Sequence, residues 1–124
     1  VSELLSRLRL FAQAHDIHIW FVAHPRKMQA DANGEYPAPK GYDISGSAAW
    51  YAKADCGVTV HRPDRVYGKT SEIHMWKCRH SWIGKEGVAE LVFDVNTSQY
   101  LPKPVYHYSK AEPIEPPKEL DAPF

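Results

Sequence analysis

The segment "IHIWFVAHPRK", residues 17–27, decides which class of fold the sequence predicts. Residues 17–23 are almost entirely apolar, and such a run is typical of a strand that is covered on both faces of a parallel sheet. Four residues that are charged, titratable or restrict the backbone follow directly: His24, Pro25, Arg26 and Lys27. Because a proline stops a central strand, we predict a buried strand whose carboxyl end carries titratable groups.

The flanking segments predict the rest of an α/β domain. Apolar residues at helical spacing indicate a first helix that ends near residues 15–16. Further segments are predicted as a long loop (25–43), a short helix (44–55) capped by Asp43 or Ser45, strands (56–62, 70–80 and 88–95), and a turn with a last short strand (96–101). The later strands are joined by short turns and should be antiparallel neighbours. We therefore expect a mixed parallel and antiparallel sheet flanked by helices.

Composition excludes some classes of protein. The chain is 44% hydrophobic and 24% charged, which is ordinary for a soluble globular domain. Its net charge is zero, so a surface for nucleic acid must be a local patch. The longest apolar run is too short to span a bilayer, and no signal peptide is recognisable. We expect a cytoplasmic protein.

The two cysteines, Cys56 and Cys78, are too few for a disulfide framework, and reduced thiols are the simpler interpretation. Their spacing to His61 and His80 does not favour a zinc site. We expect one folded unit over residues 1–101, which begins within a helix as a fragment of a longer protein would. Residues 102–124 contain six prolines and are predicted to be an extended or disordered tail.

Three groups of residues are candidates for a binding site. His24 lies where ligands bind in α/β sheets, although a structural histidine is a slightly stronger alternative. Strand alternation places Lys77 and Arg79 on one face, where they bind phosphate or simply enter solvent as the strand ends. The long loop carries Arg26, Lys27 and Lys40, and the small residues 45–48 open a helix whose N–H groups suit phosphate. The alternative is an ordinary solvated loop whose cations bind no ligand.

The order of three sequence blocks resembles one family. The blocks are "VAHPRK" (22–27), "DISGSAAWYAKADCGVTVHR" (43–62) and "WKCRHSWIGKEGVAELVFDVNTSQY" (76–100). They are similar to the last conserved blocks of the motor domain in DnaB-type ring helicases, above all phage primase-helicases and the mitochondrial Twinkle helicase. The resemblance covers most of residues 1–101. It implies a partial RecA-like (P-loop NTPase) fold and a segment of an ATP-dependent replicative helicase that unwinds DNA by moving along a single strand.

The resemblance also implies residue roles. His24 would sense the γ-phosphate, Arg79 would be the arginine finger that reaches the neighbouring subunit's nucleotide, and Lys77 would assist at the same phosphates. Single-stranded DNA would contact residues of the loop and of the helix start, namely Arg26, Lys27, Lys40, Ser45, Gly46 and Ser47.

The cofactor implied by this resemblance is ATP with Mg²⁺. In the family, ATP is bound mainly by Walker A and Walker B segments, which this sequence lacks. The 124 residues alone should therefore not hydrolyse ATP. The implied assembly is a homo-oligomer, a hexameric ring. The alternatives are a non-catalytic module of the same fold that binds single-stranded nucleic acid, and a structural domain whose cations are merely solvated.

Overall fold

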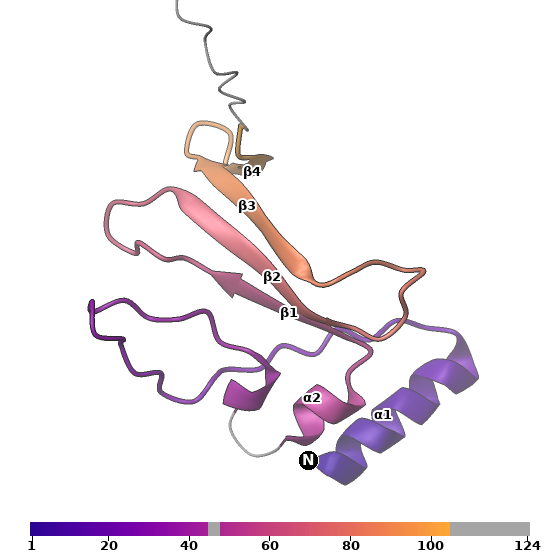
Figure 1. Ribbon diagram of the computed structural model, residues 1–124. Helices are drawn as coiled ribbons and strands as arrows, with labels where there is room; N and C mark the ends of the chain where they lie inside the picture. Colours follow the sequence, from indigo (N-terminus) through magenta and orange to yellow (C-terminus); the bar gives the residue numbers. More distant parts are fainter. Residues whose placement is uncertain (45–47, 105–124) are drawn as a thin grey trace, which may run out of the picture.

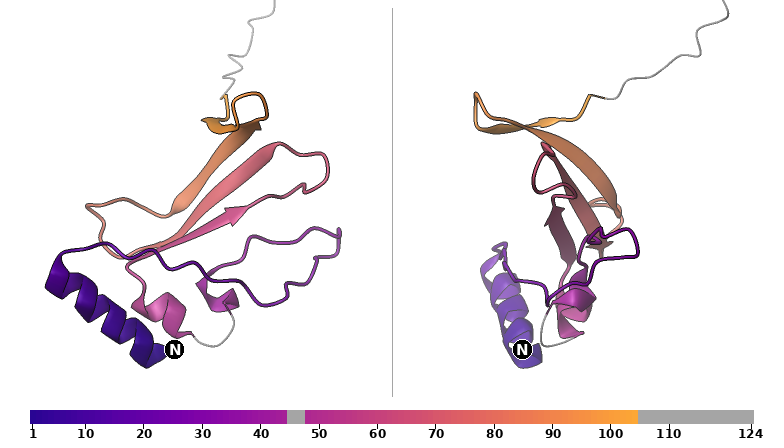
Figure 2. Two further views of the ribbon diagram at one scale, coloured as in Figure 1. Left: turned by 180° about the vertical axis from the view of Figure 1, so that it is seen from behind. Right: turned by 90° about the vertical axis from the view of Figure 1, so that its left-hand side faces the viewer.

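The computed structural model describes residues 1–44 and 48–104, which form a four-stranded sheet with its helices at one end (Figure 1). The elements are α1 (Ser2–His15), the 3₁₀ helix η1 (Gly41–Asp43), α2 (Ala49–Lys53), β1 (Cys56–His61), β2 (Thr70–Cys78), β3 (Gly87–Asp94) and β4 (Gln99–Pro102). The sheet order is β1-β2-β3-β4, and every neighbouring pair is antiparallel. Both helices lie near β1, and β4 lies at the far end of the sheet (Figure 2).

The predicted strands after residue 55 are confirmed, and side-chain oxygens organise two of the turns between them. In the β1–β2 turn, the Asp64 carboxylate accepts hydrogen bonds from the N–H groups of Tyr67 and Val66, each at 3.0 Å. These bonds hold the pKa of Asp64 below its ordinary value. Asp94 organises the β3–β4 turn in the same way by accepting from the N–H of Asn96 at 2.9 Å. Local turn chemistry therefore fixes both hairpins.

The predicted strand over residues 17–23 is wrong, and with it the mixed sheet. This segment follows α1 as extended chain, and beside it the structure records only the bridge between Pro25 and Ile44 within the described residues. Most of its apolar side chains are open to solvent, with Trp20 79% and Val22 88% exposed. A strand forms only when a neighbour takes up its backbone hydrogen bonds, and the described part of the chain provides no such neighbour. The observed sheet is therefore entirely antiparallel.

The first helix is confirmed, whereas the second is shorter than predicted. α1 ends at His15 and is capped by Asp16, which adopts the left-handed conformation (φ 52°) and donates its N–H to the Ala12 carbonyl. α2 begins at Ala49, after Ala48. Asp43 does not cap α2, because its carboxylate instead accepts the N–H of Lys40 at 2.9 Å and closes η1. The other predicted cap, Ser45, lies outside the described residues.

Trp76 on β2 joins the sheet to the segments beside it. Its Nε1–H donates to the Thr59 hydroxyl at 3.0 Å, and that hydroxyl donates to the Pro39 carbonyl at 2.6 Å. Its ring stacks on Tyr51 of α2 at 5.5 Å between centroids. The ring also lies directly over Gly57, where a side chain would collide with it. One aromatic residue thus positions the long loop, α2 and β1 against each other.

The described residues contain no fully buried apolar side chain. Strand residues on both faces of the sheet are open to solvent, such as Val60 at 71% and Val88 at 59%. The sheet therefore has apolar surface that the described elements leave uncovered. The expected tail is described only up to residue 104, and residues 105–124 lie outside the described part.

We expect Gly57→Ala to lower the free energy of unfolding by about 1–3 kcal/mol, because the added methyl group meets the Trp76 ring and forces the stack apart. Urea denaturation followed by tryptophan fluorescence measures this change. Gly87→Ala is the matched control, since a Cβ at that strand glycine meets nothing within 4 Å. Equal effects of the two substitutions would contradict the role given to Trp76.

Candidate functional site

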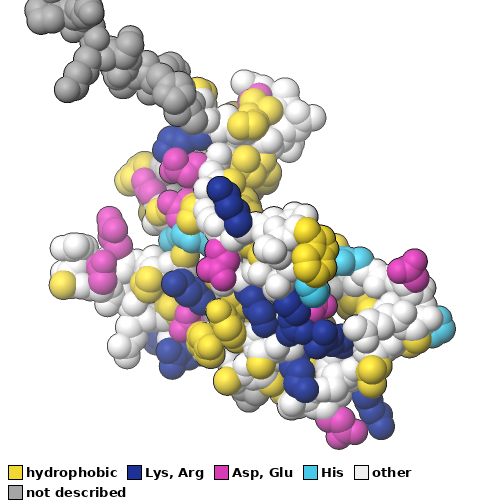
Figure 3. Space-filling model, turned by 45° about the vertical axis from the view of Figure 1, so that its right-hand side comes forward, with side chains coloured by type: hydrophobic (Ala, Val, Ile, Leu, Met, Phe, Trp, Pro, Cys, Tyr) yellow, Lys and Arg dark blue, Asp and Glu magenta, His cyan; other side chains and the backbone are white. Residues whose placement is uncertain are grey.

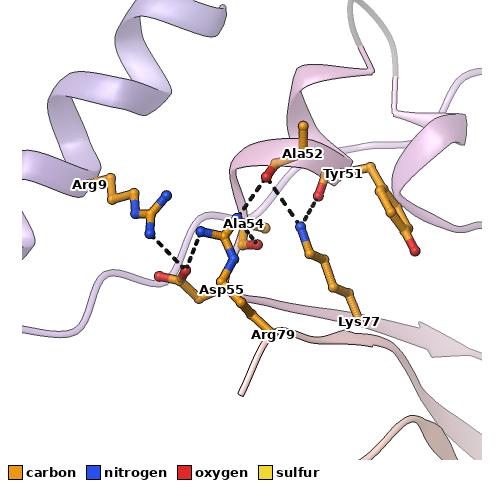
Figure 4. Close-up of polar contacts among 7 residues, drawn as sticks. All are labelled: Arg9, Tyr51, Ala52, Ala54, Asp55, Lys77 and Arg79. Atoms are coloured by element: carbon orange, nitrogen blue, oxygen red, sulfur yellow. Dashed lines mark hydrogen bonds and ion pairs between the residues drawn. The ribbon is translucent and has the colours of Figure 1, made fainter. Parts of the chain in front are cut away.

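Lys77 and Arg79, at the end of β2, come together at the C-terminus of α2 (Figure 4). Lys77 Nζ donates to the carbonyls of Tyr51 and Ala52, the latter at 3.3 Å. Arg79 Nη2 donates to the carbonyls of Ala52 at 2.8 Å and Ala54 at 3.4 Å. The prediction that both cations lie on one face of the strand agrees with this arrangement.

The C-terminus of α2 attracts these cations for a physical reason. The last carbonyls of a helix have no partner within the helix, and the helix dipole places partial negative charge there. Two cationic donors satisfy both requirements. In this structure Lys77 and Arg79 therefore act as a cap on α2, and any phosphate ligand has to compete with that cap.

Asp55 anchors this cation cluster, and sequence reasoning did not single it out. Its carboxylate lies 3.2 Å from Arg79 Nη1 and 3.8 Å from Arg9 Nη2 of α1. The Arg79 N–H also donates to the Asp55 carbonyl at 2.8 Å. The available signal in the sequence was an acidic residue between a predicted helix and a predicted strand. Arg9 is distant in sequence, and only the fold brings it to the Asp55 carboxylate. Lys and Arg side chains are seen gathered on the face drawn in Figure 3.

The electrostatics of the cluster favour an anion. Lys77, Arg79 and Arg9 surround a single carboxylate, so positive charge is in excess. Partial burial, and then the neighbouring Arg79, lower the pKa of Lys77, while Asp55 opposes this shift. An anion bound beside Lys77 would stabilise its charged form. Lys77 Nζ also lies 5.1 Å from the centre of the Tyr51 ring, which holds the ammonium near α2.

His24 does not join this cluster in the structure. It is exposed at the end of the extended segment, directly before the bridge between Pro25 and Ile44. Within residues 1–44 and 48–104, no recorded hydrogen bond or ion pair connects it to Lys77 or Arg79. Its role as a phosphate sensor stays a prediction.

Asp43 closes the base of the loop that carries the other predicted cations. Arg26 donates its N–H to the Asp43 carbonyl at 2.6 Å and its guanidinium to the Asp43 carboxylate at 3.3 Å. Because the Lys40 N–H binds the same carboxylate, both ends of the loop meet at Asp43. Lys27 is exposed. The fold thus brings Arg26 and Lys40 close together, although they are far apart in the sequence.

The remaining predicted contacts cannot be placed. Ser45, Gly46 and Ser47 lie outside the described residues. Among the residues that are described, no group of three His, Cys, Asp or Glu side chains could hold a metal ion. The candidate site is therefore a cation cluster at a helix C-terminus together with a basic loop, and the Lys and Arg donors of both match phosphate oxygens as acceptors.

Comparison with known proteins shows what the chain is similar to. No protein-family model matches the chain. The chain is 41% identical over 108 residues to "Twinkle homolog protein, chloroplastic/mitochondrial" of Arabidopsis thaliana, and this match covers 85% of the chain and 15% of that relative. The chain thus spans a small part of the relative. The similarity relates it to Twinkle homologues, the group that its sequence blocks resemble.

The same comparison bears on localisation. The relative is named as chloroplastic/mitochondrial, so the expectation of a cytoplasmic protein stays a prediction for this chain. Among the described helices, none has the length and apolar character needed to cross a membrane.

We expect Asp55→Asn to lower the pKa of Lys77 further, because it removes the carboxylate that favours the charged ammonium while Arg79 and Arg9 remain. An NMR titration of the lysine side chain measures this pKa. Asp64→Asn, in the β1–β2 turn, is the control and should leave the titration of Lys77 unchanged. An unaltered Lys77 pKa in Asp55→Asn would contradict the proposed cluster.

Proposed function

We propose that this chain is a segment of an ATP-dependent, DnaB-type DNA helicase and forms the distal part of its RecA-like motor domain. The supporting observation is that the structure joins Lys77 and Arg79 in one cluster, within a chain that is 41% identical to a Twinkle homologue. In this proposal the segment supplies phosphate contacts and a loop for single-stranded DNA. The helicase translocates on that strand and separates the duplex.

Lys77 and Arg79 bind the phosphates of ATP by exchanging their present partners. Their contacts to carbonyls are hydrogen bonds to neutral acceptors, whereas bonds to phosphate oxygens are assisted by charge on both partners and are stronger. The Arg79 side chain is 26% exposed, so it can be reached from outside the chain. A guanidinium offers its donors as a planar fork. Arg79 is thus the arginine finger, and Lys77 assists it.

The nucleotide and Mg²⁺ are held mainly by other parts of the protein. The described residues offer no cluster of metal ligands, so Mg²⁺ ligands come from outside the described residues. Bound ATP–Mg²⁺ supplies the phosphoryl group and its charge neutralisation. Since an arginine finger acts on a nucleotide held by a neighbouring subunit, the proposal includes a homo-oligomer, a hexameric ring.

The basic loop holds single-stranded DNA. The Arg26 side chain is 69% exposed even though it touches Asp43, and Lys27 is exposed beside it. Cations of this kind bind the phosphate backbone without reading sequence. His24 precedes the loop directly and senses the γ-phosphate, so movement at this residue would connect the nucleotide to DNA.

The exposed apolar surface supports the assignment to a larger domain. Trp20 and Val22 lie in solvent on extended chain, and exposed apolar patches mark surfaces that bind further polypeptide. Trp50, which packs on Phe21 at 4.7 Å, has a buried Nε1–H without a hydrogen-bond acceptor in the described structure. Such a donor is usually satisfied. We infer that further protein covers the exposed side chains of the extended segment.

One observation favours a second candidate function. Both Lys77 and Arg79 are occupied by carbonyls of α2, as purely structural residues would be. In that case the chain is a non-catalytic module of the same fold, and the basic loop binds single-stranded nucleic acid by itself. The two functions differ in whether Arg79 affects ATP hydrolysis.

We expect Arg79→Ala in the full-length protein to reduce DNA-stimulated ATP hydrolysis by at least about a thousandfold, with nucleotide binding nearly intact. Arg79→Lys keeps a cation at α2 but loses the planar fork, so it should be nearly as slow. Arg7→Ala is the control, since Arg7 is exposed and its ion pair in the described structure is with Glu3 of the same helix. Steady-state hydrolysis and nucleotide titration measure both effects, and normal turnover in Arg79→Ala would refute the arginine finger.

We expect Lys27→Ala to weaken binding of single-stranded DNA and to reduce the slope of log K against log salt by about 0.7, the value for one lost phosphate contact. Fluorescence anisotropy with an oligonucleotide at several salt concentrations measures the slope. Lys85→Ala removes an exposed lysine from the β2–β3 connection and should leave the slope unchanged. An equal slope in wild type and Lys27→Ala would rule out this contact.

A further inference from the structure

Cys56 and Cys78 lie directly opposite each other on β1 and β2. The Arg79 N–H donates to the Asp55 carbonyl at 2.8 Å, so the backbone hydrogen bonds flank the cysteine pair. The cysteines thus occupy a pair that is not itself hydrogen-bonded. At such positions the Cα atoms are about 4.5 Å apart, which falls within the range that a disulfide spans.

The two thiols are also accessible and close to each other. Cys56 is exposed, and Cys78 is partly exposed. Partial burial, and then the Cys78 thiol beside it, raise the pKa of Cys56 above the ordinary value of a thiol. Negative charge on the neighbouring Cys78 sulfur disfavours a thiolate at Cys56, so this cause of the shift places the two sulfur atoms close together. At neutral pH Cys56 is therefore protonated, and its reactions as a thiolate become faster as the pH rises.

We propose that Cys56 and Cys78 form a redox-sensitive dithiol, a modification site that a small-molecule disulfide such as oxidised glutathione converts into a cross-strand disulfide. Both sulfur atoms belong to neighbouring strands in fixed register, so the bond forms without a change of pairing. The expectation from the sequence was two reduced thiols, and the register of β1 and β2 adds that these thiols form a pair.

The reaction is a thiol–disulfide exchange in two steps. The exposed Cys56, as thiolate, attacks one sulfur of the small disulfide, which forms a mixed disulfide and releases one small thiolate. Cys78 then attacks the Cys56 sulfur, which forms the protein disulfide and releases the second small thiolate. The two protons lost by the cysteines end on the two small thiols, and two electrons pass from the protein to the oxidant.

The position of the pair gives the disulfide a consequence for the cation cluster. Asp55 precedes Cys56 and Arg79 follows Cys78, and these two neighbours already form an ion pair at 3.2 Å. A covalent bond between the cysteines holds both strand ends together and keeps Arg79 beside Asp55 and α2. Resting on the proposed function, oxidation then keeps the arginine finger away from the nucleotide and slows hydrolysis.

The test measures the disulfide directly in the full-length protein. The protein is equilibrated with mixtures of reduced and oxidised glutathione, alkylated, digested, and analysed by mass spectrometry for the peptide that joins Cys56 to Cys78. We expect the equilibrium constant for this bond to be at least about tenfold larger in the native protein than in urea, which is about 30 mV in midpoint potential. Equal or smaller values in the native protein, or only mixed disulfides with glutathione, would overturn the proposal.

A displaced pair of cysteines is the matched control. In the double variant Cys56→Ser with Val58→Cys, the new thiol lies opposite Met75 instead of Cys78. This variant has the same number of thiols. We expect its equilibrium constant for disulfide formation to be no larger in the native protein than in urea. A displaced pair that forms as readily as the natural one would show that the register does not matter, which contradicts the proposal.

Hydrolysis assays separate the regulatory consequence from the proposed function. DNA-stimulated ATP hydrolysis should fall on oxidation in the wild type, recover with a reductant, and stay constant in Cys56→Ser. A mapped disulfide with an unchanged rate would overturn the regulatory consequence. A reduced protein without any hydrolysis would contradict the proposed helicase. The mapped peptide would still show whether Cys56 and Cys78 form a disulfide.

Discussion

The carbonyl groups at the C-terminus of α2 need hydrogen-bond donors, and the described structure meets this need with side chains from β2. Lys77 and Arg79 bind these carbonyls, and Asp55 then ties Arg79 to Arg9 of α1. Three elements that are separate in the sequence are joined at this one point. The position of the candidate site follows from satisfying a helix end, whatever the ligand is.

This constraint also explains how one pair of residues serves structure and chemistry. A cation that caps a helix through neutral carbonyls is held in place but is not irreversibly committed, because phosphate is the better acceptor. The cap keeps the two side chains oriented while no anion is present. Asp55 sets how strongly they are held, since it neutralises part of their charge.

The apolar surface differs from the helix end, because the described residues leave much of it exposed to solvent. Residues 17–23 have the composition of a buried strand and the exposure of a surface loop. Trp76, in contrast, gathers the long loop, α2 and β1 around one ring through Thr59 and Gly57. The chain is thus well organised around the sheet end near β1, whereas the extended segment stays largely exposed among the described residues.

The sequence by itself determined the elements whose signals are local. Helical spacing predicted α1, and alternation with turn residues predicted β1 to β4, because these patterns depend on neighbours a few residues away. The placement of Lys77 and Arg79 on one face followed for the same reason. Only the tertiary structure decided that residues 17–23 have no strand partner in the described part of the chain, and that Asp43 closes the loop. It also decided that Asp55 meets Arg9 and that the two cysteines lie opposite each other. Each of these depends on contacts between distant residues, and a strand in particular exists only when a second one lies beside it.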